Sequence, residues 1–290
     1  MLITIGNEAL SLTVDTLGAQ MMHLQTMDGC EYLWQGDPKY WGDRAPVLFP
    51  FIGRLYQNTY RLHGTPYDMK IHGFAAASEF AVAEQGADFV VLRLENTPET
   101  YEVYPVSFTL DITYRLEGAT VVTDYRVTNR GGEMMHFGIG GHPGFRVPLE
   151  EGERFEDYRL VFSEGCQPDR VGFTEAVLLS GCDRPYPLEG GDTIPLSHGL
   201  FDDDAIILKN MAKKVTLCGS KTRSVTVHYP DMAYLGIWHW PKTDAPYVCI
   251  EPWTSLPARQ DVEEEFSCKS DLIHLAAGKT YENTWIISIT

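Results

Sequence analysis

The sequence has no cluster of basic residues and no long apolar run. Its 23 Lys and Arg residues stand against 40 Asp and Glu residues, which gives a formal net charge of −17. Because nucleic acids and anionic membranes bind clustered Lys and Arg, we expect no nucleic-acid partner and no membrane partner. No stretch approaches the roughly 18 apolar residues that a membrane helix needs. A neutral small molecule suits this charge better than a phosphate-rich ligand.

Paired cysteines, metal-binding spacings and targeting signals are also missing. The six cysteines contain no C-x-x-C pair, which argues against a zinc ribbon or a redox motif and favours free thiols. No acidic run has the spacing of a calcium loop, and no glycine-rich phosphate loop opens a helix. We therefore expect no metal and no cofactor. The first residues, MLITIGNEALSL, lack the features of a signal peptide, and a cytoplasmic location is the default expectation.

Helical periodicity is scarce, and 17 prolines spread over 290 residues would interrupt most helices. Runs that alternate apolar and polar residues recur instead, which is typical of half-buried strands. Gly86 and Gly118 each lie between two such runs and predict tight hairpins. The pattern predicts an all-β chain, and its length favours one large antiparallel β-sandwich domain over 1–290 rather than a closed barrel. The runs are 2–14, 79–95, 107–129, 157–164, 214–220, 224–231, 247–253 and 281–289.

Two segments in the first third of the chain break this pattern with Gly, Pro and aromatic residues. Residues 44–60 leave Arg54 as the only cation near the end of an apolar turn, where its guanidinium could donate several hydrogen bonds. In residues 68–76, His72 precedes a glycine, which lets a ligand approach the backbone closely. The alternatives are a surface arginine and a structural histidine. His63 has a similar context and is interpreted as a hairpin turn residue.

A third segment, residues 134–149, holds four glycines and two histidines, too many for a regular strand throughout. His142 stands between Gly141 and Pro143, and an imidazole with so little freedom suits a general acid or base. A structural bulge is the alternative. His136, by contrast, is interpreted as a strand residue.

In a fourth segment, residues 247–261, an apolar strand runs directly into Glu251, with Trp253 two residues later. Surroundings of low dielectric constant would raise the pKa of this carboxyl toward a value useful for proton transfer. A strand-end glutamate that faces solvent is the alternative. A separate acidic run, Asp202 to Asp204, precedes an apolar segment, and taken alone it is more often a solvated turn.

Taken in order, these features resemble the aldose 1-epimerase, or galactose mutarotase-like, family, and in particular its LacX-like branch. The resemblance spans residues 44 to 261. It implies the large antiparallel β-sandwich of that family, a cofactor-free isomerase acting on a small monosaccharide as a monomer or homodimer, and a role in carbohydrate metabolism, galactose metabolism included. The matching motifs are Arg54 after PFIG, HGF at 72–74, GHPGF at 141–145, the acidic run and IEPWTSLP at 250–257.

The resemblance also implies roles for individual residues. Glu251 would be the general base that removes the proton of the C1 hydroxyl, and His142 the general acid that protonates the ring oxygen. His72 and Arg54 would orient hydroxyls and the ring oxygen. An aspartate of the acidic run would hold further hydroxyls. Asp202 and Asp204 are favoured over Asp203, because alternate residues of an extended chain project to the same side.

Two departures from the family pattern keep alternatives open. The histidine loop reads GHPGFRVP rather than Asn-His-Thr, so the hydroxyl preference of other members cannot be copied. Relatives that act on hexose 6-phosphates often carry an arginine where this chain has Ala76, although Arg54 and Arg146 remain available for a phosphate. A non-catalytic carbohydrate-binding protein is a second alternative. A lyase or hydrolase acting on oligosaccharides is a third, but hydrolases generally need two carboxylates and only Glu251 is clearly placed.

Overall fold

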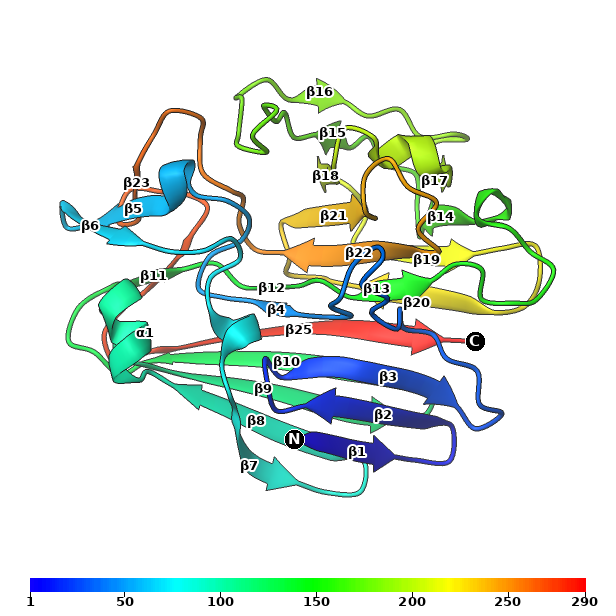
Figure 1. Ribbon diagram of the computed structural model, residues 1–290, viewed down its shortest axis with the longest axis horizontal. Coiled ribbons are helices and arrows are strands. Elements are labelled where there is room, and N and C mark those ends of the chain that lie inside the picture. Colours follow the sequence, from blue (N-terminus) through cyan, green and yellow to red (C-terminus); the bar gives the residue numbers. More distant parts are fainter.

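The computed structural model describes residues 1–290 and consists almost entirely of antiparallel β-strands (Figure 1). The prediction of an all-β sandwich is therefore confirmed. The larger of its two main sheets has nine strands. In spatial order they are β17 (Thr193–Pro195), β14 (Arg159–Phe162), β19 (Lys214–Cys218), β20 (Ser224–His228), β25 (Thr280–Ile289), β10 (Thr120–Asn129), β9 (Phe108–Glu117), β8 (Phe89–Glu95) and β7 (Ala81–Gln85).

The second main sheet has eight shorter strands, of which β22 is the longest. Its neighbours β12 and β13 pair with different parts of β22, so the chain between them runs along the same edge. The strands are β16 (Arg184–Pro185), β15 (Asp169–Arg170), β18 (Ile206–Lys209), β21 (Tyr234–Trp238), β22 (Tyr247–Trp253), β12 (Gly140–Gly141), β4 (Val47–Leu48) and β13 (Gly144–Arg146).

Three small sheets and a few helical turns complete the structure. No helix combines the length and apolar character that crossing a membrane would require. The helical elements are α1 (Pro98–Val103) and four 3₁₀ turns at Tyr56–Asn58, Ala75–Ala77, Phe155–Asp157 and His198–Phe201. The small sheets are β1 (Leu2–Gly6), β2 (Leu10–Asp15) and β3 (Gln20–Thr26); β11 (Met135–Phe137) and β24 (Ile273–Leu275); and β23 (Glu264–Glu265), β5 (Thr59–Leu62) and β6 (Thr65–Asp68).

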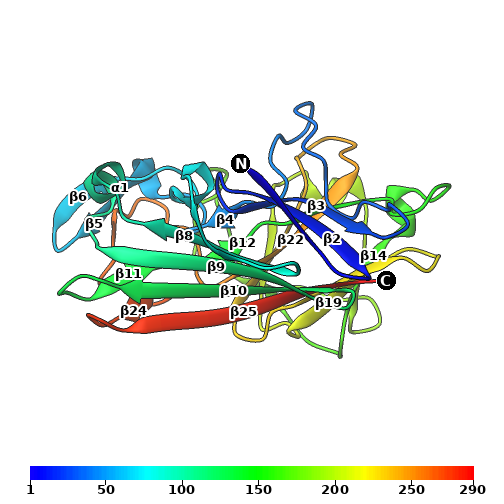
Figure 2. The same cartoon turned by 90° about the horizontal axis from the view of Figure 1, so that it is seen from below.

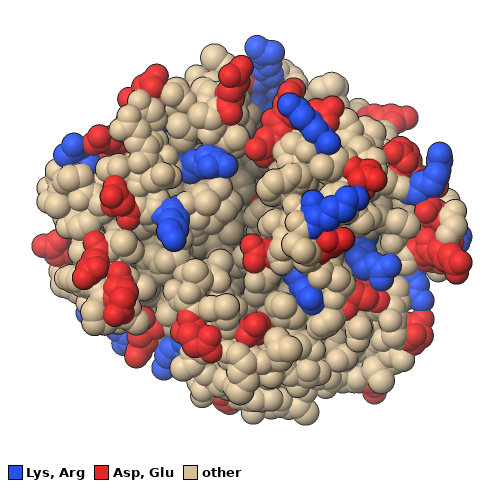
Figure 3. All heavy atoms as spheres, in the orientation of Figure 1, with Lys and Arg blue, Asp and Glu red and all other residues tan.

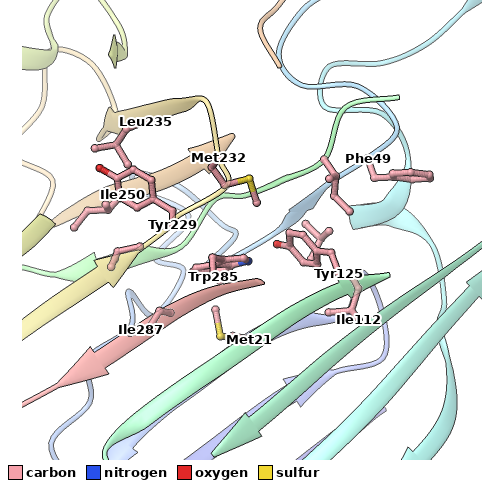
Figure 4. Packing of buried hydrophobic residues seen from close by; sticks show 14 of the residues in the cluster. Met21, Phe49, Ile112, Tyr125, Tyr229, Met232, Leu235, Ile250, Trp285 and Ile287 are labelled. Carbon is pink, nitrogen blue, oxygen red and sulfur yellow. The ribbon is translucent and has the colours of Figure 1, made fainter. Parts of the chain in front are cut away.

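The core lies between the two main sheets. Figure 2 shows β9, β10 and β25 running side by side, with β22, β12 and β4 above them in that view. One cluster of 67 buried residues joins the sheets, and Figure 4 shows Trp285 of β25 between Tyr125 of β10 and the strands of the opposite sheet. A side chain on Gly141 of β12 would meet the Trp285 ring at 2.8 Å. The nine-stranded sheet thus supports the strand that leads into His142. One domain over 1–290 stays a prediction.

The regular strands agree with the sequence pattern, and the short elements do not follow from it. Tight turns at Gly86 and Gly118 join β7 to β8 and β9 to β10, as predicted. The interpretation of His63 as a turn residue is also correct, because it lies between β5 and β6 with a φ of 52°. Helix α1 was not predicted. Its start is nevertheless marked in the sequence, by Thr97 as a capping residue and Pro98 in the first turn.

Candidate active site

A cavity of about 680 Å³ opens over β21 and β22 of the eight-stranded sheet. Figure 3 shows a hollow near the middle of this face, with charged side chains of both signs around it. The structure brings five of the six predicted site residues to this cavity, and Asp202 is the exception. The five are Arg54, His72, His142, Asp204 and Glu251. They come from five separate segments of the chain, so only the fold makes them neighbours.

Glu251 lies within β22, directly opposite Gly236 of β21. It is 1% exposed, so the alternative of a glutamate that faces solvent is wrong. A side chain on Gly236 would place its Cβ 3.1 Å from Cβ of Glu251, so the glycine leaves room for the carboxyl. Burial raises the pKa of Glu251 well above its usual value, because a charged carboxylate loses its hydration there. Burial therefore favours the protonated carboxyl.

His142 lies in the break between β12 and β13. Gly140 pairs with Trp253 and Gly144 pairs with Cys249, and continuing either register places His142 opposite Glu251. Residues opposite each other across two strands project from the same face of the sheet. Nε2 of His142 accordingly lies 3.2 Å from Oε2 of Glu251. The bent Gly-His-Pro-Gly segment, which interrupts the strand pattern, therefore places an imidazole beside a buried carboxyl.

The surroundings of the His142–Glu251 pair favour the neutral form of each side chain. Burial, with His72 nearby, lowers the pKa of His142 well below its usual value, while burial raises the pKa of Glu251. Both shifts favour a state in which the pair holds one proton in total. Nδ1 of His142, Oε2 of Glu251 and Nε1 of Trp253 are buried and have no hydrogen-bond partner. Buried polar groups are rarely left unpaired, and these three atoms are available to bind a polar ligand.

His72 is held in a defined orientation by its backbone. Its φ is 64°, in the left-handed region, and its Nδ1 accepts a hydrogen bond from the backbone N–H of Gly53 at 3.1 Å. A neutral imidazole that accepts at Nδ1 carries its proton on Nε2. Burial and the nearby Arg54 lower the pKa of His72 to about 4, so the ring is neutral at pH 7 and acts as a donor. Its ring centre lies 5.7 Å from that of His142.

Two glycines fix the loops that carry His72 and Arg54. Gly73 has a φ of 77°, and a Cβ there would lie 2.2 Å from the carbonyl oxygen of Phe49. Gly53 has a φ of 74°, and a Cβ there would lie 2.3 Å from Cγ of Pro257. Only glycine tolerates both the conformation and the close approach. The glycines that precede Arg54 and follow His72 in the sequence motifs are therefore required by the backbone.

Arg54 is exposed at the cavity, and its side chain makes no hydrogen bond or ion pair in the structure. Asp204 has a φ of 73°, and its Oδ1 accepts from the backbone N–H of Ala205 at 2.8 Å. Asp202 follows directly on a 3₁₀ turn and lies in a neighbouring cavity together with Asp203. The assumption of an extended chain through 202–204 is therefore wrong, because this run forms a helical turn before β18 begins. Asp204 alone of the run reaches the cavity of Glu251.

Three tryptophans that the sequence analysis did not single out form one wall of the cavity. The ring centre of Trp41 lies 4.8 Å from that of His142, and Trp238 lies 5.5 Å from His142 almost at right angles. The ring of Trp240 lies edge-to-face with that of Trp238, with centres 6.0 Å apart, and is 46% exposed. The run IWHWP at 237–241 was the available signal, since alternate tryptophans on a strand line the same face. Aromatic faces of this kind can pack against a sugar ring.

A metal site is the other chemistry that these residues could support. Ligand atoms of His142, Cys249 and Glu251 lie within 4.8 Å of one another. Burial and the neighbouring Glu251 raise the pKa of the Cys249 thiol well above its usual value, so it stays protonated. A thiol binds a metal as the thiolate. The donor set therefore suits proton transfer better than metal binding.

Comparison with known proteins agrees with this geometry. The family model described as "Aldose 1-epimerase" matches residues 1–288. The chain belongs to the aldose 1-epimerase family. It is 36% identical over 266 residues to the chromosomal LacX protein of Lactococcus lactis subsp. lactis, covering 88% of each chain. Membership of this family makes the protein an isomerase and implies a small-molecule sugar as its ligand.

Two solved structures share the whole aldose 1-epimerase fold seen here. A galactose mutarotase related enzyme from Lactobacillus acidophilus superimposes with a TM-score of 0.94 at 32% identity, over 100% of this chain and 97% of that one. A galactose mutarotase-like protein from Lactobacillus casei gives a TM-score of 0.93 at 31% identity, over 100% of both chains. The predicted resemblance to this family is thus confirmed.

Proposed function

We propose that the protein interconverts the α and β anomers of a free aldose by general acid and base catalysis. The observation that carries this proposal is the 3.2 Å contact between Nε2 of His142 and Oε2 of Glu251 at the cavity. In a cyclic aldose, the C1 hydroxyl oxygen and the ring oxygen are bound to the same carbon. An acid and a base that act on these two oxygens together must therefore lie side by side, as this pair does.

In the proposed reaction, the carboxylate of Glu251 takes the proton of the C1 hydroxyl while the protonated His142 gives a proton to the ring oxygen. The bond between C1 and the ring oxygen breaks, and the C1–O bond becomes the carbonyl of an open-chain aldehyde. Rotation about C1–C2 presents the other face of the carbonyl. The reverse proton transfers then close the ring as the other anomer.

The protonation of the His142–Glu251 pair supports this scheme. One proton on the His142–Glu251 pair is the number that the scheme needs, since one partner must give a proton while the other takes one. The pKa shifts of both residues favour this singly protonated pair. The single proton can lie on either partner, and the form with a carboxylate and an imidazolium is the one that starts the reaction; Nε2 and Oε2 lie 3.2 Å apart but form no hydrogen bond in the structure. Polar hydroxyls of the sugar would stabilise that charged form.

Other groups at the cavity would bind and orient the sugar. Neutral His72 offers its Nε2 proton, unpaired Arg54 offers a guanidinium fork, and Asp204 offers a carboxylate acceptor. We propose these three for binding rather than proton transfer. Asp202 remains a weaker proposal, because it lies only in the neighbouring cavity.

The cavity chemistry favours a free aldose over a hexose 6-phosphate. Ala76 lines the cavity at the position where phosphate-binding relatives carry an arginine. Arg146 lines a different cavity, so it does not supply the missing charge. Arg54 is the only lysine or arginine at the site, and it faces three acidic residues, Asp43, Asp204 and Glu251. Galactose is the first sugar to test, because the two similar solved structures are a galactose mutarotase related enzyme and a galactose mutarotase-like protein. A cytoplasmic location and a monomer or homodimer stay predictions.

The experiment is anomer exchange measured by NMR exchange spectroscopy with galactose, glucose and other free aldoses. We expect the wild-type protein to accelerate exchange over buffer, and Glu251→Gln and His142→Ala each to lose about 10²–10⁴-fold, the usual contribution of a general acid or base. His228→Ala, a histidine of β20 away from the cavity, is the matched control and should keep the wild-type rate.

Two results would contradict the proposal. One is no acceleration with any aldose, and the other is an undiminished rate in both site variants. Sugar binding without exchange would instead support the alternative of a carbohydrate-binding protein.

A further inference from the structure

The half-buried ring of Trp41 packs against the imidazole of His142. Their ring centres lie 4.8 Å apart, and their planes meet at 35°. Trp238 and His72 approach the same imidazole at 5.5 Å and 5.7 Å, with planes at 84° and 86° to it. Of these three rings, Trp41 alone is closer to parallel than to perpendicular. It is therefore the ring that turns its face toward His142.

This tryptophan lies in a loop, residues 35–43, whose two ends are both hydrogen-bonded to Gly144. The carbonyl oxygen of Gly144 accepts from the backbone N–H of Trp34 at 2.9 Å, and its own N–H donates to the carbonyl oxygen of Arg44 at 2.8 Å. Both ends of the loop are thus tied to a residue that lies two positions after His142. The loop and the imidazole consequently keep a fixed position relative to each other.

Gly144 also leaves the room that the Trp41 ring occupies. A Cβ at this position would lie 3.0 Å from Cζ3 of Trp41 and 3.2 Å from Cβ of Trp34, closer than side chains normally pack. Gly144 does not have a positive φ, so its backbone conformation alone does not require glycine. The last glycine of the GHPG motif at 141–144 is therefore explained by the space that the tryptophan needs beside His142.

The imidazole of His142 lacks a support that catalytic histidines usually have. The second ring nitrogen of such a histidine usually donates to a carboxylate or a backbone carbonyl, but Nδ1 of His142 is buried and has no hydrogen-bond partner. The proposed reaction puts a positive charge on this ring, and burial opposes that charge. Only Glu251 has an acidic oxygen within 4 Å of the imidazole. The ionisable groups around His142 are Glu251, Cys249 and His72 next to it, and Asp43, Arg54 and Asp204 elsewhere in the cavity wall.

We infer that Trp41 is a positioning residue for the general acid, whose indole face orients the imidazole of His142 and stabilises its protonated form. The face of an indole ring carries negative charge density and attracts a cation within about 6 Å, most strongly where water is excluded. The imidazolium gains this attraction and the neutral ring does not, so the contact favours the reacting form over the resting form. The inference rests on the proposed function, because it assigns Trp41 to the proton donor of that reaction.

The test replaces Trp41 alone with a mono-, a di- and a tetrafluorinated tryptophan, and measures kcat and KM for anomer exchange of galactose. Fluorine withdraws charge density from the ring face and weakens its attraction for a cation step by step, while the ring keeps nearly the same size. We expect kcat to fall at each step, by about tenfold over the series. The control is the same series at Trp34, whose ring stacks on Tyr247 at 4.6 Å rather than on an imidazole, and it should leave kcat within about twofold.

Two ordinary variants test whether an aromatic face is needed. Trp41→Leu should lower kcat by about 10–30-fold, and Trp41→Phe, which keeps an aromatic face, should recover part of that loss. Equal losses in the two variants overturn the inference, because bulk alone would then explain the role of Trp41.

The fluorinated series separates this inference from the proposed function. Fast exchange in the wild-type protein with a kcat that does not change along the series overturns the inference and leaves the proposed function standing. A rise in KM with kcat unchanged also overturns it, in favour of a ring that only holds the sugar. If the wild-type protein accelerates no exchange, the proposed function fails and the inference fails with it, because the imidazolium then has no step to serve.

Discussion

The two main sheets use their strands in different ways. In the nine-stranded sheet, β9, β10 and β25 have ten residues each and pair over nearly their full lengths. In the eight-stranded sheet, β4 and β12 have two residues each, and all seven residues of β22 are buried. The non-glycine residues with positive φ that line the cavity, His72, Val177 and Asp204, lie in loops. The first sheet provides a regular support, and the second carries the candidate site on irregular backbone.

The largest expected effect is a loss of stability on removing a core side chain, and it tests whether the first sheet provides support while the second holds the site. Trp285→Ala removes a 1% exposed ring between the sheets and should lower the free energy of unfolding by about 3–5 kcal/mol, as for other buried Trp truncations. Trp238→Ala, in the half-buried wall of the site, should cost far less stability and reduce anomer exchange. Urea unfolding and exchange rates measure the two effects. Equal stability losses in both variants would contradict the division.

A second prediction concerns the backbone next to His72. Gly73→Ala must adopt a φ of 77° and also meets the Phe49 carbonyl oxygen, whereas Gly64→Ala adopts a φ of 78° in open space. A left-handed alanine alone costs about 1–2 kcal/mol. Gly64→Ala should therefore lose about that much stability and keep its activity. Gly73→Ala should lose more stability and also reduce anomer exchange, because His72 is displaced. Equal behaviour of the two variants would show that the close approach is unimportant.

A third prediction tests the exposed cation of the site. Arg54 makes no ion pair within the protein, so Arg54→Ala should change the free energy of unfolding by less than about 0.5 kcal/mol. Loss of charge-assisted hydrogen bonds to the sugar should raise KM by about tenfold or more. Arg146→Ala, at a different cavity, is the control and should leave KM unchanged. An unchanged KM in Arg54→Ala would remove Arg54 from the binding site.

A fourth prediction concerns the pH dependence of stability. Burial lowers the pKa of His239 to about 4, below the usual value near 6.5 of the unfolded chain. Between these two values the unfolded chain binds the proton and the folded chain does not. Stability is therefore complete above pH 6.5 and falls as the pH drops toward 4, by up to ~1.4 kcal/mol per pH unit for this residue. His239→Gln should flatten the curve of unfolding free energy against pH. An unchanged slope of unfolding free energy against pH in His239→Gln would contradict the lowered pKa of His239.

The difference between the sheets also explains what could be predicted from the sequence. Strands such as β25, with one face in the core and one in solvent, show a clear alternation, and their positions were predicted. The two-residue strands β4 and β12 carry no period at all, so they could not be predicted. They exist because β12 pairs with β22 and β4 pairs with β12, and this pairing is a property of the folded chain.

The candidate site follows the same rule. His142 and Glu251 stood out because Gly and Pro interrupt the pattern around them, and the resemblance to the family gave them roles. The prediction that Asp202 and Asp204 face the same side assumed an extended chain. In the structure a 3₁₀ turn ends at Asp202, and only Asp204 lines the cavity of Glu251. Trp41 in a loop and Trp238 at the end of β21 were missed, because an aromatic residue looks the same in sequence whether it packs on the core or lines a cavity.

The central claim is that His142 and Glu251 open and close the sugar ring with one shared proton. The most direct test is carbon NMR on an aldose labelled with ¹³C at C1 and ¹⁸O in the C1 hydroxyl, with the protein present. The account predicts rapid exchange between the α and β signals with the ¹⁸O retained through many turnovers, and loss of that exchange in Glu251→Gln. Exchange no faster than in buffer, or loss of the ¹⁸O label with each inversion, would contradict it.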